Sequence, residues 1–366
     1  MISIGYFILS FSLLQWLIAL MNLISGKFTY KSKSRTEPEK LVSVLIPARN
    51  EERTIGNILK DLLLQEYSTI EIIVFDDMSD DRTAEIVSEI SLTDRRIKLM
   101  RSAGLPAGWQ GKNFACHTMS DTAAGNYLLF LDADVRIARD LIRNTISYAE
   151  KHQLALFSIF PQQIMLSIGE WSTVPSMNYI LLTLLPLILV RKSTFSSLAA
   201  ANGQFMLFRS DTYREHMPHS IFRGNRIEDI EIARYLKRRK LKIACLAGNT
   251  SIQCRMYQNY QEAINGFSKN VIGFFGNSFI LAILFWLVTT FGFLIVLFTT
   301  PILFFLVLLG LIISVRIMVS MTSGQNILRN LLFIIPQQAA IGLFILKAFI
   351  NSVKKQYKWK GRNISL

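Results

Sequence analysis

The residues best suited to chemistry in this 366-residue chain are carboxylates that directly follow short apolar segments. Asp76 and Asp77 begin the acidic run DDMSDD, and Asp132 and Asp134 belong to the run LDADV. An acidic turn can accept hydrogen bonds from a base edge or from ribose hydroxyls. Carboxylates also hold hard cations such as Mg²⁺ together with substrate phosphates. A solvated turn that caps the next helix is the structural alternative for the first run.

Three further polar clusters have both a chemical and a structural interpretation. Pro47 and Arg49 lie in PARNEE, where a turn and a helix start could receive an anion or simply cap a helix. Asp229, in IEDIE, could act as a general base or only complement the dipole of a helix start. Gln253 and Arg255, in QCRMY, combine an amide with a guanidinium that can grip phosphate in a bidentate manner.

The segments around these clusters alternate between strand and helix patterns. Near-continuous apolar runs predict buried strands, and apolar residues at helical spacing predict helices between them. This alternation predicts an α/β fold with a parallel sheet covered by helices on both faces, in which ligands bind at the carboxyl ends of the strands. The expected strands are 41–46, 70–75, 97–100 and 127–131, and the expected helices are 51–65, 83–90 and 114–124.

Long apolar segments flank this domain at both ends. Residues 3–24 carry no charge and are long enough to span a hydrocarbon core of ~30 Å. A basic cluster follows at once, so the positive-inside bias places the next residues in the cytoplasm. We therefore expect a transmembrane anchor at 1–26 and a cytoplasmic catalytic domain at 27–270. The basic cluster consists of Lys27, Lys31, Lys33 and Arg35.

The C-terminal part is expected to hold membrane helices at 271–350 and a basic tail at 351–366. Residues 271–315 carry no charge and suit two helices. The segment 331–349 is interrupted by polar residues. If it crossed the membrane, the basic tail would lie outside the cytoplasm, which conflicts with the positive-inside rule. An interfacial amphipathic helix is the alternative there. The shorter run 179–190 could be core or interfacial.

Composition excludes several classes of protein. The chain is 51% hydrophobic and 18% charged, so it is too apolar to be soluble throughout and too apolar to be disordered. The net charge of +14 could suggest nucleic acid, but the basic residues cluster beside the membrane segments, where anionic headgroups explain them better. We expect no nucleic-acid partner. A transporter would carry ionisable residues inside its spans, and residues 271–315 have none.

Taken in order, the polar clusters resemble the inverting family-two glycosyltransferases of GT-A fold. The similar motifs fall between residues 41 and 257, and together they are far more specific than any one alone. The resemblance implies a mixed α/β sheet and transfer of a sugar from a nucleoside diphosphate, with inversion. The motifs are VLIPARNEE, DDMSDD, GWQGK, FLDADV, ANGQFMLF, IEDIEI and QCRMY.

The resemblance assigns one group of residues to the donor. Pro47, Arg49, Asp76 and Asp77 would face the nucleoside, and Lys112 would lie close to the base or the phosphates.

A second group would carry the reaction. Asp132 and Asp134 would form the motif for a divalent metal, Mg²⁺ or Mn²⁺, with Asp134 the preferred direct ligand. Asp229 would be the base, and Gln253 and Arg255 would stand near the diphosphate and the acceptor. Processive polymerases of the family show QxxRW, so the departure in QCRMY favours single transfer.

The motif GLPAGWQGKNFAC, together with the N-terminal anchor and the C-terminal membrane helices, makes the chain similar to a narrower, membrane-anchored group that includes carotenoid-acid and hopanoid-associated glycosyltransferases. This similarity implies a multi-pass enzyme of the cell membrane with a lipid-like acceptor. A polyprenyl-phosphate or glycolipid glycosyltransferase is the alternative, and a transporter is the alternative from another class.

Overall fold

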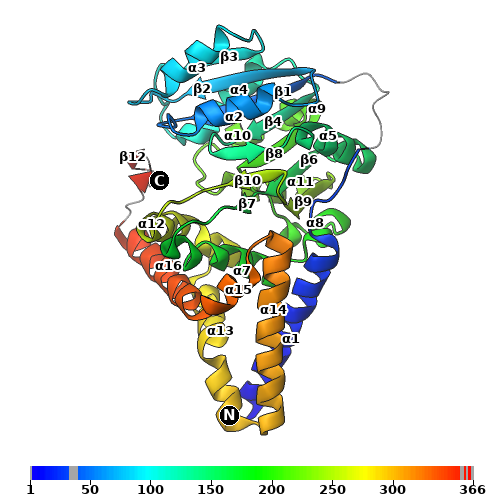
Figure 1. The fold of residues 1–366 in the computed structure, drawn as a ribbon, viewed down its shortest axis with the longest axis vertical. Coiled ribbons are helices and arrows are strands. Elements are labelled where there is room, and N and C mark those ends of the chain that lie inside the picture. Colours follow the sequence, from blue (N-terminus) through cyan, green and yellow to red (C-terminus); the bar gives the residue numbers. More distant parts are fainter. Residues whose placement is uncertain (1, 33–39, 355–357, 360–361, 364–366) are drawn as a thin grey trace.

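The computed structural model describes residues 2–32, 40–354, 358–359 and 362–363. An α/β domain occupies the broad end, and the long helices α1 (Ile2–Ser25), α13 (Phe279–Thr299) and α14 (Ile302–Ser323) form a narrow bundle at the other end (Figure 1). Of the basic cluster after the anchor, Lys33 and Arg35 lie outside the described residues, as does half of the basic tail.

The main sheet has the strand order β3-β2-β1-β4-β8-β6-β9. The four strands expected from the sequence are confirmed, and β1 pairs in parallel with both β2 and β4. The mixed sheet that the resemblance implies is also confirmed, because β8 runs antiparallel to both β4 and β6. The parallel pairing predicted from the alternation of strands and helices holds for β1, β2, β3 and β4 but not for β8. The strands are β1 (Val42–Ala48), β2 (Ile70–Asp76), β3 (Ile97–Arg101), β4 (Tyr127–Leu131), β6 (Leu156–Phe160), β8 (Phe205–Arg209) and β9 (Ile243–Ala247).

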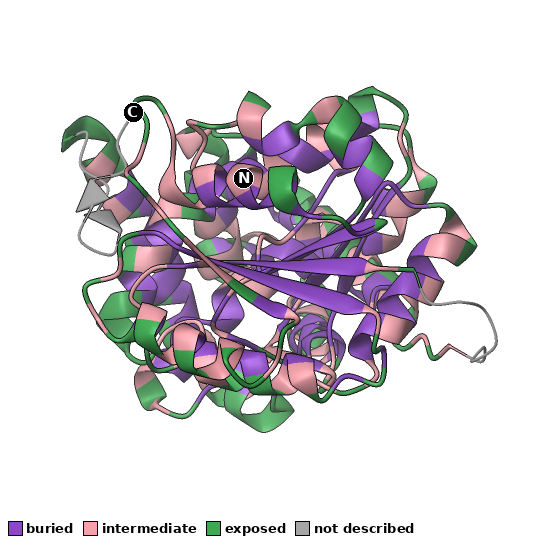
Figure 2. Cartoon of the chain, turned by 90° about the horizontal axis from the view of Figure 1, so that it is seen from above, coloured by how far each residue is buried: buried purple, intermediate pink, exposed green. Residues whose placement is uncertain are grey.

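Helices cover both faces of this sheet, as Figure 2 shows from above with the buried strands between them. Leu45 and Val44 of β1 belong to different apolar clusters, because successive side chains of a strand point to opposite faces. The helices of this domain are α2 (Ile55–Leu63), α3 (Thr83–Ser91), α4 (Gly111–Thr122), α5 (Leu141–His152), α9 (Ser210–His216), α10 (Pro218–Ile221) and α11 (Glu228–Arg238).

A second, three-stranded sheet was not expected from the sequence. Its order is β5-β10-β7, with β5 (Val135–Ile137), β7 (Gln162–Gln163) and β10 (Ile252–Cys254). Each strand is too short to give a recognisable pattern. The sheet matters because β5 begins directly after Asp134, and its pairing with β10 sets Cys254 opposite Val135.

Short helices join the α/β domain to the long ones. The run 179–190 lies within α7 (Pro175–Leu184) and α8 (Leu187–Lys192), and most of its apolar side chains are buried. Asn22 of α1 donates hydrogen bonds to the carbonyl oxygens of Leu182 and Leu185, each at 2.9 Å. The run is therefore core. The other connecting elements are α6 (Ile168–Trp171), η1 (Ser196–Leu198), α12 (Tyr260–Asn270), η2 (Val271–Phe275) and α15 (Ile327–Leu332), and the short strands β11 (Lys358–Trp359) and β12 (Arg362–Asn363) follow.

Four helices are long and apolar enough to cross a membrane: α1, α13, α14 and α16 (Ile334–Lys354). The uncharged block 271–315 does divide into two long helices, at Thr300 and Pro301. Yet α14 continues to Ser323 and includes Arg316, so this span is not free of ionisable residues. The Arg316 guanidinium lies 3.8 Å from the centre of the Tyr179 ring and donates to Gln337 Oε1 at 2.8 Å.

The fourth helix, α16, runs obliquely between the bundle and the α/β domain (Figure 1). At its beginning, the Gln338 carbonyl accepts from Trp286 Nε1 of α13 at 2.9 Å. Farther along, Phe344 contacts Phe267 of α12, with ring centres 5.3 Å apart. One face of α16 thus packs on the protein, while the other exposes apolar side chains: Leu343, Leu346, Phe349, Ile350 and Val353.

Candidate active site

The loops that follow β1 and β2 interlock at the carboxyl edge of the sheet. Arg49 donates from Nη1 to the carbonyl oxygens of Asp77 and Met78, at 2.5 and 3.0 Å. The Asp80 amide donates to Asn50 Oδ1 at 2.9 Å. Arg49 therefore shapes the acidic turn through its backbone.

The other donor-side candidates of this region lie at the same edge. Pro47 is a half-buried residue of β1, and its strand partner in the register is Phe75. Asp76 and Asp77 are both buried, and the Asp77 amide donates to the Ala48 carbonyl at 2.8 Å. Parallel pairing of β1 and β2 brings these residues together, because it aligns their carboxyl ends.

Lys112, near the start of α4, lies among acidic groups at the end of β4. Its Nζ is 2.7 Å from Asp132 Oδ1 and 4.0 Å from Glu228 Oε1, and it donates to the Gly203 carbonyl at 3.0 Å. Burial would lower the pKa of Lys112, but Asp132 and Glu228 hold that pKa well above its usual value. Lys112 is therefore a permanent positive charge between these carboxylates.

Asp229 is held by two backbone amides at the start of α11. Its Oδ2 accepts from the Gly203 amide at 2.9 Å, and its Oδ1 accepts from the Ile230 amide at 2.8 Å. Burial raises the pKa of Asp229, whereas the two amides and Lys112 oppose that rise. Its neighbour Glu228 has a pKa raised to about 7, chiefly by burial and also by Asp229. A carboxylate with a raised pKa is better matched to taking up a proton near neutral pH.

Asp134 has an oxygen, Oδ1, that is buried and has no hydrogen-bond partner in the described part of the chain. Burial raises the pKa of Asp134 to about 7, with Asp132 and Glu51 contributing. Cys254 of β10 lies against it, and Gln204 donates from Nε2 to Cys254 Sγ at 2.9 Å. An orphaned carboxylate oxygen beside a second carboxylate is a donor set that fits a hard divalent cation.

No group of three or more His, Cys, Asp or Glu side chains that could hold a metal occurs among the described residues. Mg²⁺ is commonly bound by only one or two carboxylates, with substrate phosphates and water as its other ligands. The pair Asp132 and Asp134 is therefore compatible with a metal that arrives with its substrate.

Gln253 and Arg255 lie on either side of Cys254 and point to different partners. Gln253 donates from Nε2 to Gln162 Oε1 at 3.4 Å. Arg255 forms an ion pair with Glu170, with Nε 2.8 Å from Oε1. Within the described ranges, neither side chain forms a hydrogen bond or an ion pair with Lys112.

Three site residues were not singled out as such from the sequence: Gly203, Glu228 and Glu170. Gly203 lies within the ANGQF motif, and a Cβ there would be 3.0 Å from Lys112 Nζ. Glu228 directly precedes Asp229, so its position was a usable signal. Glu170 had no signal, because its role depends on contact with a residue 85 positions away.

Comparison with known proteins identifies the family of the chain. The profile of glycosyl transferase family 2 matches residues 43–230, slightly more than half of the chain. The 4,4'-diaponeurosporenoate glycosyltransferase of Staphylococcus haemolyticus is 28% identical over 268 residues, which cover 69% of this chain and 68% of that protein. The enzyme of the same name from Staphylococcus aureus is 26% identical over 250 residues, which cover 66% of this chain and 63% of that protein.

A solved structure supports the fold. The mannosyltransferase PcManGT from Pyrobaculum calidifontis, in complex with GDP-Man and Mn²⁺, aligns with a TM-score of 0.58 and 14% identity, and the alignment covers 96% of this chain and 98% of that one. The sheet with helices on both faces is therefore a GT-A-like fold. Together with the family profile, this shows that the chain belongs to glycosyl transferase family 2 and is a glycosyltransferase.

Proposed function

We propose that this protein is a membrane-bound inverting glycosyltransferase that moves a sugar from a nucleoside diphosphate to a lipid-like acceptor. The observation that carries the proposal is the carboxylate of Asp229, fixed by two backbone amides beside the Lys112–Asp132 pair. The relatives' names favour a carotenoid acid as the acceptor class. A polyprenyl phosphate or a glycolipid is the alternative.

Inversion requires one displacement at the anomeric carbon, in which the acceptor oxygen attacks as the nucleoside diphosphate leaves. For a hydroxyl acceptor we assign the proton to Asp229, because its amide contacts fix both carboxylate oxygens and its pKa is raised; an acceptor carboxylate is already ionised at pH 7 and needs no base. Lys112 keeps a positive charge beside Asp132, where the leaving diphosphate gains negative charge. A divalent cation held by Asp132 and Asp134 would offset further charge on that leaving group.

The residues after β1 and β2 are proposed to bind the nucleoside of the donor. Arg49 fixes the acidic turn of Asp76 and Asp77 from the backbone side, so that turn can receive the nucleoside. Pro47 lies in the strand that leads to it.

We infer a topology of three spans, with α16 at the membrane surface. The Gly5 end of α1 packs against Thr299 and Thr300, between α13 and α14, so these three helices share one uncharged far end. The described basic residues Lys27 and Lys347 lie nearer the α/β domain. With the domain in the cytoplasm, an interfacial α16 keeps the basic tail there too, which removes the conflict with the positive-inside rule. A reporter fused after Lys269 should then be cytoplasmic, and an external signal would overturn this topology.

The test of function is transfer by the purified full-length protein in lipid nanodiscs. UDP- and GDP-linked sugars are offered with a carotenoid acid, a hydroxylated carotenoid, a polyprenyl phosphate and a diacylglycerol, and products are identified by mass spectrometry. We expect product with a carotenoid-type acceptor and none in the Asp134→Ala variant. Product with polyprenyl phosphate alone would favour the alternative acceptor, and no product with any pair would refute the proposal.

A further inference from the structure

We propose that Glu170 is a positioning residue that orients the Arg255 guanidinium for the donor's diphosphate and ties it to the membrane-facing helices. This inference rests on the proposed function, because it takes Arg255 to be a phosphate-binding group. Glu170 itself touches no substrate.

The contact between the two side chains is two-pronged. Arg255 Nε donates to Glu170 Oε1 at 2.8 Å, and Nη2 donates to Oε2 at 3.3 Å. The Arg255 side chain is 36% exposed, whereas that of Glu170 is fully buried. The third nitrogen of the Arg255 guanidinium, Nη1, has no hydrogen-bond partner among the described residues. One edge of the planar guanidinium is therefore clamped, and the other edge is available to an oxyanion.

The Glu170 carboxylate is itself held rigidly. Its Oε2 accepts from the amides of Leu166 and Ser167, at 3.0 and 2.6 Å, while Ser167 Oγ accepts from the Glu170 amide. This reciprocal capping box fixes the start of α6. Burial would raise the pKa of Glu170, but the bonds from Arg255 and Ser167 hold that pKa below its usual value. The clamp therefore stays ionised at neutral pH.

The next residue connects this clamp to the long helices. The Trp171 carbonyl accepts from Gln337 Nε2 of α16 at 3.1 Å. Gln337 Oε1 in turn accepts from Arg316 of α14 at 2.8 Å, and the Gln337 carbonyl accepts from Ser176 of α7 at 3.2 Å. A movement of α14 or α16 would thus be passed through α6 to Arg255.

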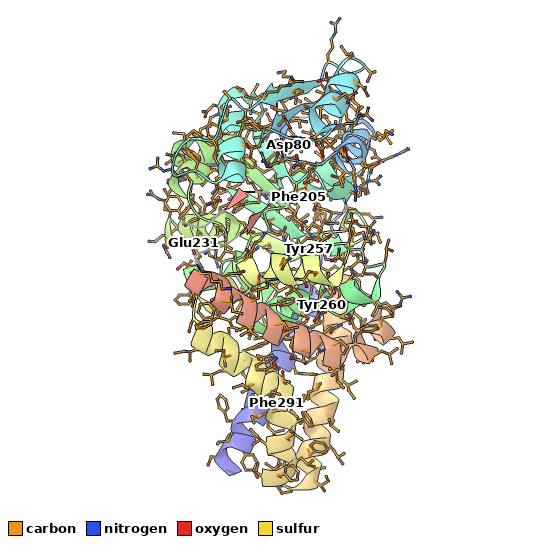
Figure 3. All side chains as sticks on the ribbon, turned by 90° about the vertical axis from the view of Figure 1, so that its left-hand side faces the viewer. Asp80, Phe205, Glu231, Tyr257, Tyr260 and Phe291 are labelled. Carbon is orange, nitrogen blue, oxygen red and sulfur yellow. The ribbon has the colours of Figure 1, made fainter. Side chains whose placement is uncertain are left out.

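The packing around α6 leaves it little freedom to move independently. A Cβ on Gly169 would lie 2.7 Å from the Tyr260 backbone nitrogen, so α6 sits tightly against the start of α12. Figure 3 places Tyr257 and Tyr260 at the level where the α/β domain meets α16. The Arg255 clamp therefore stands at the boundary between the donor site and the membrane helices.

The experiment measures binding of UDP and GDP by calorimetry to the intact protein in nanodiscs, together with KM for the sugar donor and kcat. Glu170→Gln should weaken nucleoside diphosphate binding by about 10-fold, because a free Arg255 side chain must then be ordered by the ligand. Glu170→Asp, which keeps the charge but shortens the arm, should give a smaller loss. This second variant keeps the test decisive if Glu170→Gln folds poorly.

A matched control exists elsewhere in the domain. Asp61 clamps Arg136 through Nε and Nη2, at 2.6 and 2.8 Å, and accepts from the Ile137 amide. It reproduces the Glu170 clamp on Arg136 of β5, an arginine to which the proposed function gives no role in donor binding. Asp61→Asn should lower thermal stability but leave nucleoside diphosphate binding within about 2-fold of the wild type.

A double-mutant cycle separates positioning from general damage. If Glu170 acts through Arg255, adding Glu170→Gln to Arg255→Gln causes no further loss of binding. Two results would overturn the proposal. In the first, Glu170→Gln weakens nucleoside diphosphate binding as much in the Arg255→Gln variant as it does in the wild type. In the second, Asp61→Asn weakens that binding as much as Glu170→Gln does. If Arg255→Gln binds normally, the positioning role falls, and transfer by that same variant shows whether the proposed function survives.

Discussion

The sharpest test of the proposed chemistry is Asp229→Asn. The amide keeps the size of the side chain but cannot accept a proton at neutral pH. For an acceptor hydroxyl, removal of a general base lowers the rate by about 10²–10⁴-fold, equivalent to about 2.7–5.5 kcal/mol in the activation free energy. A helix-start charge alone contributes only about 0.3–1 kcal/mol to stability.

The hydrogen bonds of Asp229 add a cost in folding. Its two oxygens accept separately from the amides of Gly203 and Ile230, at 2.9 and 2.8 Å. An asparagine has one acceptor oxygen, so it can satisfy only one of these amides, and the other faces an NH₂ group. A buried donor left without its partner costs about 1–3 kcal/mol in the free energy of unfolding. Although asparagine has nearly the same shape as aspartate, the substitution therefore removes one hydrogen bond to a buried amide.

The assay is single-turnover transfer in nanodiscs at pH 7, with binding of the nucleoside diphosphate measured alongside. Glu228→Gln is the control, because Glu228 neighbours Asp229 and also faces Lys112 but is more buried. We expect Asp229→Asn to bind the nucleoside diphosphate normally and to lose transfer to a hydroxyl, whereas Glu228→Gln loses much less.

The chemistry of the acceptor makes the test stricter. A carboxylic acid, with a pKa near that of Glu at about 4.3, is already ionised at pH 7 and has no proton to give up. Asp229→Asn should then reduce transfer to a carboxylate by no more than about 10-fold. Hydroxyl transfer within about 10-fold of the wild type in a folded variant would refute the base assignment. Glu231 would be a weak substitute, because it is paired with Arg234 at 2.7 Å.

Three other predictions follow from the site and its surroundings. Asp134→Ala should abolish transfer because it removes a proposed ligand of the divalent cation, and EDTA should abolish transfer by the wild type because it removes the cation itself. Full activity in excess EDTA would contradict this prediction. Lys112→Met removes the cation that lowers the pKa of the proposed base, so the base needs a higher pH to ionise, and the acid limb of the pH–rate profile should move to higher pH; an unmoved limb would argue against that coupling. Gly266→Ala drives a methyl into Tyr257 and should cost about 1–3 kcal/mol in thermal unfolding, whereas Gly310→Ala, with open space around it, should cost far less.

The sequence alone determined the local elements and where their polar ends would gather. Four strands were recognisable because fully buried strands are continuously apolar, and helical spacing revealed the helices between them. Asp76 and Asp132 could be placed at one edge because a parallel sheet was predicted and each lies at the carboxyl end of a strand; β2 and β4 do pair in parallel with β1. The lengths of the apolar segments likewise indicated α1, α13 and α14.

The tertiary structure decided what those polar groups contact. Lys112 meets Asp132 and Glu228 only because the sheet order brings α4, β4 and α11 together. No local pattern records such a meeting, since periodicity reports only which face of a segment is buried.

The direction of α16 and the Glu170–Arg255 clamp were decided in the same way. The segment 331–349 has the length of a span, but its packing on α12 and α13 sets its course. Glu170 and Arg255 are 85 residues apart in the sequence, and the folding of the short sheet and of α6 brings them into contact. Both elements are too short to give a periodic pattern in the sequence. Side-chain pairing over such separations depends on the order and packing of whole elements, and these form only when the chain has folded.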